Sequence, residues 1–98
     1  MAQFIAAVRR NLERFSASDF TPELLEEEAE RARVLYADGT FRQMWGRGDA
    51  PGAVVLIEAG TIAEAQAVLA SLPLAVREML ILDLLLPLTP YRGFGPRA

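Results

Sequence analysis

The chain has 98 residues, of which 52% are hydrophobic, and its net charge at pH 7 is −3. It contains no Cys and no His, and all ten of its basic residues are Arg. This composition predicts one globular domain and excludes thiol nucleophiles, histidine-based catalysis, lysine Schiff bases and metal sites built from Cys and His.

Charge and apolar patterning also restrict the partners and the location. Scattered arginines in a chain of net negative charge argue against nucleic-acid binding. The longest apolar run, residues 79–88, contains Asp83 and is shorter than the ~20 residues that a membrane-spanning helix needs. The start of the chain lacks the basic region and the cleavage site of a secretory signal. We therefore expect a cytoplasmic protein with no membrane partner and, in the absence of Cys and His, no metal cofactor.

The N-terminal segment fits two kinds of element. A helix is favoured by apolar residues at helical spacing, namely Phe4, Ile5, Val8, Leu12 and Phe15. The alternative is a strand from Ala2 to Arg10. The elements that follow are a helix, two strands, a helix and a strand, which lack only a first strand to complete the order βαββαβ. We therefore expect the strand.

The clearest helix is predicted from Pro22 to about Ala37. Thr21 suits the N-cap, Pro22 suits the first helical position, and acidic residues are concentrated in the first turns. Gly39 follows as a stop signal.

The next segments predict a β-hairpin, a second helix and a last strand. Residues 39–45 and 51–60 are short runs bounded by Gly, Pro and Asp, with a turn between them. Residues 61–72 carry apolar side chains at helical spacing, with Thr61 as N-cap. Residues 77–88 are bounded by prolines and predict a buried strand, although Leu is a weaker strand former.

These elements predict an α+β domain over residues 1–88 with the ferredoxin-like order βαββαβ and a four-stranded antiparallel sheet. Residues 89–98 have aromatic, basic and Gly/Pro character without periodicity. They predict an extended C-terminal arm that either packs across a partner, closes a pocket or frays in solution.

Glu28 is the acidic residue that best fits a catalytic base. The first helix carries an apolar stripe formed by Leu24, Leu25, Ala32, Leu35 and Tyr36. Glu28 lies one turn from Leu24 and from Ala32, so we expect it to point toward the sheet, where burial raises the pKa of a carboxyl. Tyr36 or Tyr91 can assist proton transfer by the carboxylates. The alternative is that Glu28 belongs to a solvated acidic face.

The strand at residues 39–45 supplies candidate binding groups. Alternation along a strand places Phe41, Gln43 and Trp45 on one face and Arg42 on the other. If the first face meets the helices, Gln43 and the indole N–H of Trp45 offer hydrogen bonds inside an apolar cleft. The alternative is that both aromatic residues are ordinary core. Arg42 is expected at a barrel interface, in an ion pair or on a bound anion.

The surroundings of two acidic residues on the later strands, Glu58 and Asp83, can also be predicted. Glu58 ends its strand on the same face as apolar neighbours, so it either lines the mouth of the pocket or faces solvent. Asp83 lies in an otherwise apolar strand and must be paired if it is buried. Its expected partner is one of Arg9, Arg10 and Arg42.

The chain resembles the muconolactone isomerase family over about residues 24–88. The motifs that carry the resemblance, in matching order and spacing, are Gly39-Thr40-Phe41, Trp45 and Leu72-Pro73-Leu74. The resemblance implies a sheet with two helices on one face, which pairs into a dimeric α+β barrel and often into larger rings. It also implies cofactor-free proton transfer that moves a double bond in an unsaturated lactone. Glu28, or its neighbour Glu27, matches the acid in the first helix of the family.

The chain departs from the family pattern in its pocket. Histidine, tyrosine, asparagine, lysine and acidic positions of the family are replaced at Gln43, Ala50, Pro51, Ala53, Leu25 or Ala29, Met79 and Ile81. We therefore expect a rebuilt pocket that acts on an unsaturated lactone or another enolisable carbonyl compound, by a double-bond shift or a cyclisation. The alternatives are a non-catalytic oligomeric module that binds a small molecule, and a cofactor-free monooxygenase of the same barrel fold. In each case the expected protein partner is a second copy of the chain.

Overall fold

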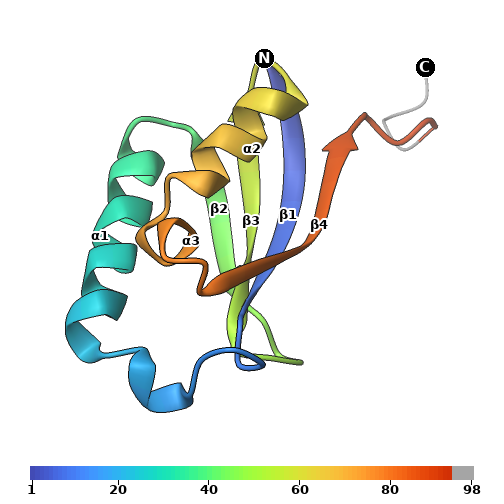
Figure 1. Ribbon diagram of the computed structural model, residues 1–98. Helices are drawn as coiled ribbons and strands as arrows, with labels where there is room; N and C mark the ends of the chain where they lie inside the picture. The colour runs from blue at the N-terminus through green and yellow to red at the C-terminus, as the bar shows by residue number, and fades with distance from the viewer. Residues whose placement is uncertain (94–98) are drawn as a thin grey trace.

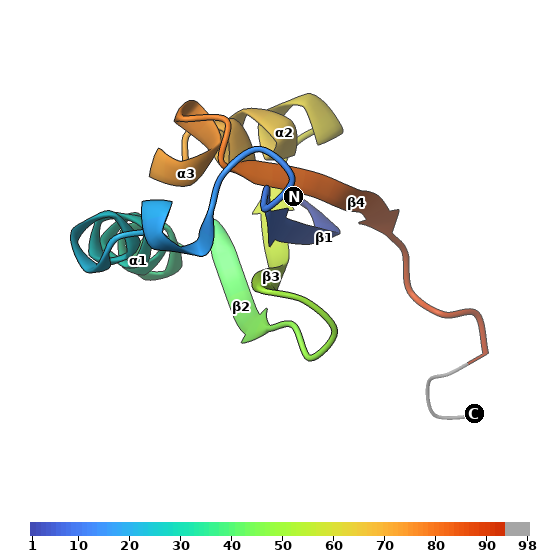
Figure 2. The same cartoon turned by 60° about the horizontal axis from the view of Figure 1, so that its bottom comes forward.

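The computed structural model describes residues 1–93 and shows a four-stranded antiparallel sheet with its helices on one side (Figures 1 and 2). The strands are β1 (Ala2–Arg10), β2 (Phe41–Gly46), β3 (Gly52–Ala59) and β4 (Leu80–Leu88). The helical elements are the 3₁₀ turn η1 (Ala17–Asp19), α1 (Pro22–Ala37), α2 (Ile62–Ala70) and α3 (Pro73–Val76). The sheet order β2-β3-β1-β4 confirms the predicted ferredoxin-like fold.

β1 occupies an inner position of the sheet and has the predicted bounds. It pairs with β3 without interruption, from Ala2 opposite Ala59 to Arg9 opposite Gly52. Phe4, Ala6 and Val8 of β1 are buried under the helices, an alternation expected for a strand with one covered face. The helical spacing of the apolar residues is therefore misleading here, because they divide between the two faces of a strand.

The helices α1 and α2 begin where the sequence signals lie, α1 ends as predicted, and α2 ends at Ala70, two residues before the predicted end. The Thr21 side chain accepts a hydrogen bond from the amide of Leu24 at 3.2 Å, and Thr61 accepts one from Glu64 at 3.1 Å. Gly39 follows α1 with a φ of +87°, a conformation that glycine adopts without strain. The short helix α3, with Pro73 at its first position, lies between α2 and β4, where the sequence pattern predicts no helix.

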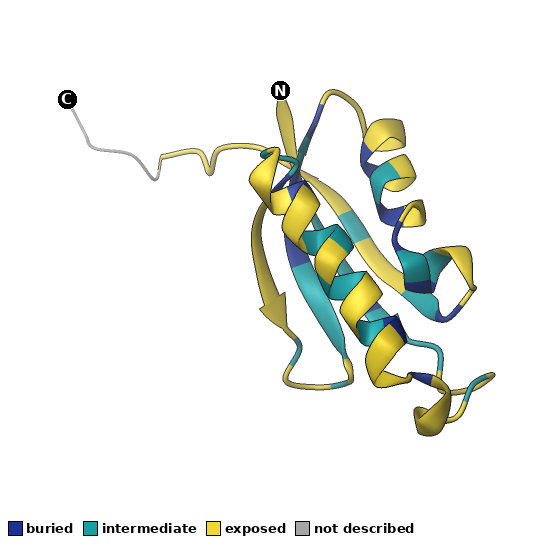
Figure 3. Ribbon diagram, turned by 90° about the vertical axis from the view of Figure 1, so that its left-hand side faces the viewer, coloured by how far each residue is buried: buried dark blue, intermediate teal, exposed yellow. Residues whose placement is uncertain are grey.

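The core lies between the helices and the covered face of the sheet. Its main cluster consists of Phe4, Ala6, Leu35, Phe41, Val55, Ile57, Ala59, Ala65, Leu69 and Leu72. A second cluster, Phe20, Leu24, Leu74 and Met79, joins the start of α1 to α3. Figure 3 shows the consequence for α1, whose surface facing the sheet is buried or half-buried while the opposite surface is exposed.

β2 contains a register shift that changes which of its side chains face the helices. The shift lies between Phe41 and Gln43. An extra residue of this kind turns all later side chains to the other face. Phe41 and Met44 are therefore opposite inward-facing residues of β3, whereas Gln43 and Trp45 are on the uncovered face, here called the outer face. The prediction that Phe41, Gln43 and Trp45 share one face is wrong for this reason.

β4 contains a second register shift, opposite residues 7 and 8 of β1, which leaves Asp83 without a paired residue. Beyond the shift, Leu84, Leu86 and Leu88 lie on the outer face, and all three are exposed. One extra residue thus places a row of leucines on the side of the sheet that no helix covers.

Asp83 joins two arginines. Its Oδ1 accepts from Arg9 Nε at 3.0 Å and its Oδ2 accepts from Arg47 Nη1 at 2.7 Å. Arg47, and then Arg9, lower the pKa of Asp83. Arg47 also binds Asp49 at 2.7 Å and lowers the pKa of Asp49 to about 2. The predicted arginine partner of Asp83 is confirmed for Arg9, and Arg47 is a second partner that the sequence did not reveal.

The structure describes part of the predicted C-terminal arm. Of the predicted C-terminal arm, residues 89–93 follow β4 and form neither helix nor strand, and residues 94–98 lie outside the described residues.

No helix in residues 1–93 is long and apolar enough to cross a membrane.

Gly52 is a position where the close pairing of β1 with β3 leaves no room for a side chain. A Cβ built at Gly52 would lie 2.1 Å from the Val8 carbonyl oxygen and 2.8 Å from the Arg9 Cα, whereas one at Gly48 meets nothing within 4 Å. We expect Gly52→Ala to lower the free energy of unfolding by about 1–3 kcal/mol, since the backbone must move. Gly48→Ala should change it by less than about 0.5 kcal/mol. Urea unfolding of both variants checks this, and equal midpoints would contradict the register.

Candidate functional site

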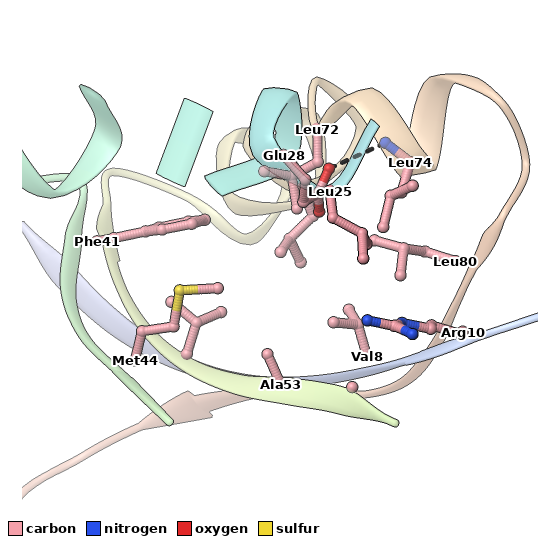
Figure 4. Close-up of a pocket in the computed structure, with 13 residues that line it drawn as sticks. Val8, Arg10, Leu25, Glu28, Phe41, Met44, Ala53, Leu72, Leu74 and Leu80 are labelled. Carbon is pink, nitrogen blue, oxygen red and sulfur yellow. Dashed lines mark hydrogen bonds between the residues drawn. The ribbon is translucent and has the colours of Figure 1, made fainter. Parts of the chain in front are cut away.

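A cleft of about 160 Å³ lies between the covered face of the sheet and the helices α1 and α3 (Figure 4). Apolar side chains form most of its walls, among them Leu25, Phe41 and Met44. The charged side chains among its lining residues are Glu28 on α1 and Arg10 at the end of β1. We call it the Glu28 cleft.

Glu28 reaches the cleft from the apolar stripe of α1. The side chain is half-buried, and its Oε1 accepts a hydrogen bond from the backbone amide of Leu74 at 2.9 Å. Figure 4 shows the carboxylate directed from the helices into the space above the sheet. The predicted inward orientation of Glu28 is therefore confirmed, while its neighbour Glu27 is exposed and lies 3.9 Å from Arg77.

The amide that binds Glu28 belongs to the first turn of α3. Helix starts leave amides without partners inside the helix, and a polar residue at the N-cap commonly accepts from one of them. The N-cap of α3 is Leu72, which has no polar side chain, and Pro73 has no N–H. Leu74 is then the first free donor, so Glu28 takes the place of the missing cap and ties α1 to α3.

The environment of Glu28 shifts its proton affinity. Burial raises the pKa of the carboxyl, and the hydrogen bond from Leu74 opposes that rise without cancelling it. Among the described residues, the second carboxylate oxygen has no hydrogen-bond partner. Glu28 is thus fixed by one oxygen and retains another that can take a proton from a ligand, the arrangement that a general base requires.

Arg10 is a site residue that the sequence analysis missed. It continues the inward-facing row of Phe4, Ala6 and Val8, so strand alternation alone would have placed it under the helices. Its guanidinium carbon lies 5.1 Å from the centroid of the Phe20 ring. Within the described part of the chain, Arg10 forms no ion pair.

The other predicted site residues are distributed over several places. Phe41 lines the Glu28 cleft. Tyr36 and Gln43 border a separate, open groove between α1 and β2. Trp45 is exposed on the outer face because of the register shift in β2. The structure therefore brings Glu28 together with Phe41 but not with Gln43 or Trp45.

Arg42 and Glu58 lie together at the far end of the hairpin. Arg42 Nη1 is 3.4 Å from Glu58 Oε2, so the ion pair expected for Arg42 is present. Glu58 alternates with the inward-facing Ile57 and Ala59 and does not reach the Glu28 cleft. In residues 1–93, no three side chains of the types His, Cys, Asp and Glu come together in a way that could hold a metal ion.

Two substitutions of Glu28 distinguish the stabilising effect of the helix cap from the effect of the charge. Glu28→Gln and Glu28→Ala both remove the ionisable group, but only Gln keeps an oxygen that accepts from Leu74. We expect Glu28→Ala to be about 0.5–2 kcal/mol less stable than Glu28→Gln, as for the loss of a helix cap. Glu27→Ala and Glu27→Gln should differ little, because Glu27 is exposed. Urea unfolding at pH 7 measures both pairs, and equal stability of the two Glu28 variants would refute the cap.

The raised pKa of Glu28 also makes stability depend on pH. The folded state holds the proton of Glu28 more tightly than the unfolded state, so ionisation of this group costs free energy on folding. The stability that protonated Glu28 contributes is fully present below the pKa that Glu28 has in the unfolded chain. It is lost as the pH rises through the pKa of Glu28 in the folded chain. The stability of Glu28→Gln relative to the parent should therefore increase between acidic and neutral pH. A difference that stays constant over this range would contradict the shift.

Comparison with models of protein families and with curated proteins finds no match to the sequence.

Proposed function

We propose that the chain is a small cofactor-free enzyme, similar to muconolactone isomerases, that transfers a proton on an unsaturated lactone or another enolisable carbonyl compound. The observation that carries this proposal is Glu28, a half-buried carboxylate in an apolar cleft with a raised pKa and one free oxygen. Such a group combines a position inside a ligand-sized space with a proton affinity suited to a general base.

The proposed reaction moves one proton and no electrons to or from an external partner. Glu28 takes a proton from the carbon next to the carbonyl, and the electron pair of the broken C–H bond forms a C=C bond. The carbonyl oxygen then carries the negative charge of an enolate. Return of the proton from Glu28 to a different carbon of the conjugated system completes a double-bond shift and restores the carboxylate.

The composition and the size of the cleft support a small substrate and a single proton carrier. The chain has no His, Cys or Lys, and the other charged side chain at the cleft is that of Arg10, a hydrogen-bond donor without an acceptor atom. The volume of about 160 Å³ is below the ~300–1,000 Å³ typical of sites for drug-sized ligands. Apolar walls also limit the water that would compete for the carboxylate.

A binding module without catalysis is the second candidate, and the Leu74 hydrogen bond favours it. If capping α3 is the whole role of Glu28, the cleft is a small-molecule pocket in which the carboxylate serves the fold alone. The two candidates differ in turnover and not in ligand binding, so an activity measurement on Glu28 variants separates them.

We also propose that two copies of the chain pair through the outer face of the sheet. This face carries exposed leucines of β4 and Trp45 of β2, with no helix over them. An exposed apolar surface of this kind is typical of a protein interface. A face-to-face pair is also the assembly that the resemblance to muconolactone isomerases implies.

Replacement of the base tests the catalytic proposal. Glu28→Gln keeps the shape of the side chain and its bond to Leu74 but removes proton acceptance, so turnover should fall by roughly 10²–10⁴-fold. A suitable reaction is the conversion of the β,γ-unsaturated lactone α-angelica lactone into its conjugated isomer, followed by ultraviolet absorbance and by proton NMR. Glu27→Gln is the matched control and should react like the parent. If Glu28→Gln also matches the parent, the binding-module candidate takes precedence.

Replacement on the outer face tests the pairing. Leu86 is 47% exposed on this face and Val34 is 45% exposed on the solvent side of α1. We expect the parent to be at least dimeric by light scattering at micromolar concentration, and Leu86→Glu to be monomeric because a charge is costly in an apolar interface. Val34→Glu should keep the mass of the parent. A monomeric parent would end this proposal.

A further inference from the structure

Arg10 brings a positive charge to the Glu28 cleft, and no acidic side chain of residues 1–93 forms an ion pair with it. Most arginines of the described residues lie beside a carboxylate, namely Arg9, Arg14, Arg33, Arg42, Arg47 and Arg77. Arg10 is half-buried, and its contacts are the Phe20 ring and the apolar lining of the cleft. A partly desolvated cation of this kind attracts an anion from solution.

The carboxylate of Glu28 does not neutralise Arg10. The two side chains form no ion pair, and the hydrogen bond that Glu28 accepts comes from the Leu74 amide. In Figure 4, Glu28 enters the cleft from the helices, whereas Arg10 enters from the strand at the other side. The space between them is therefore bounded by a proton acceptor at one side and by a cation at the other.

We propose that Arg10 binds a negatively charged oxygen of the ligand held in the Glu28 cleft. The planar guanidinium offers several N–H donors in one plane, a geometry that suits carboxylate and enolate oxygens. The inference deepens the proposed function, because it takes the cleft as the ligand site, and it names the group that orients the ligand toward Glu28.

The negative oxygen can have two sources with the same chemistry. It is either a carboxylate that the ligand carries throughout, or the enolate oxygen that forms when Glu28 takes the proton. In the second case Glu28 becomes neutral as the ligand becomes negative, so the charge moves toward Arg10 as the reaction proceeds. Arg10 would then act in catalysis as well as in binding.

Three ring compounds of similar size distinguish these sources by equilibrium binding. Cyclohexanone is neutral, cyclohexane-1,3-dione is an enolate anion at neutral pH, and cyclohexanecarboxylate carries a permanent carboxylate. Their dissociation constants are measured by NMR titration of the full chain at pH 7.5. We expect at least one anion to bind more tightly than cyclohexanone, and Arg10→Gln to weaken that anion by about 10- to 100-fold with cyclohexanone unchanged.

Two further variants control for structure. Arg10→Lys keeps the charge and should bind the preferred anion more tightly than Arg10→Gln. Arg14 lies over the Phe15 ring at 5.3 Å, much as Arg10 lies over Phe20, but is outside the cleft, so Arg14→Gln should bind like the parent. A loss confined to the dione assigns the enolate as the source, and a loss confined to the carboxylate assigns the permanent group.

The inference is overturned if the parent binds neither anion more tightly than cyclohexanone, or if Arg10→Gln binds the anions as the parent does. Equal binding by the Gln and Lys variants would overturn it as well. None of these results depends on turnover. Parent-like turnover by Glu28→Gln would refute the catalytic proposal alone, while the anion preference of Arg10 would still stand or fall on the titrations.

Discussion

The unbroken pairing of β1 with β3 is the constraint from which the rest of the molecule is positioned. It runs from Ala2 opposite Ala59 to Arg9 opposite Gly52, and Gly52 allows the two backbones to approach closely. The pairing sets one row of β1 side chains under the helices, and the last member of that row is Arg10. The same register that builds the core therefore delivers a cation to the edge of the cleft, and no loop is needed to position it.

Most of the fold could be predicted from the sequence because its elements carry strong local signals. Thr21, Pro22 and Gly39 mark both ends of α1, and the topology required a strand where the helical spacing of β1 suggested a helix. The register shifts in β2 and β4 could not be predicted, since apolar residues lie on both faces of these strands and hide the change in alternation. The shift in β2 explains why Gln43 and Trp45 are on the outer face.

The parts of the candidate site that depend on one element could be predicted from the sequence. The contacts between two elements could not. Glu28 follows from the apolar stripe of α1 alone, whereas its partner, the Leu74 amide, depends on a short helix far along the chain. The hydrogen bond and the burial of Glu28 have opposite effects on the pKa of its carboxyl. Capping α3 favours a charged acceptor and lowers its pKa, while burial raises the pKa. The free oxygen is what lets one carboxylate serve the fold and remain open to a ligand.

The extra residue in β4 also bears on how the chain avoids uncontrolled association. β4 is an edge strand rich in leucine, and such strands are templates on which other chains can extend a sheet and begin a fibre. The irregularity at Asp83 interrupts its regular ladder, and Pro87 removes one amide from the strand. The edge of the sheet is thereby a poor template for another strand, although its leucines stay available on the outer face. The exposed leucines of β4 and its open backbone edge are therefore two separate surfaces, and the irregular ladder limits strand addition at the edge alone.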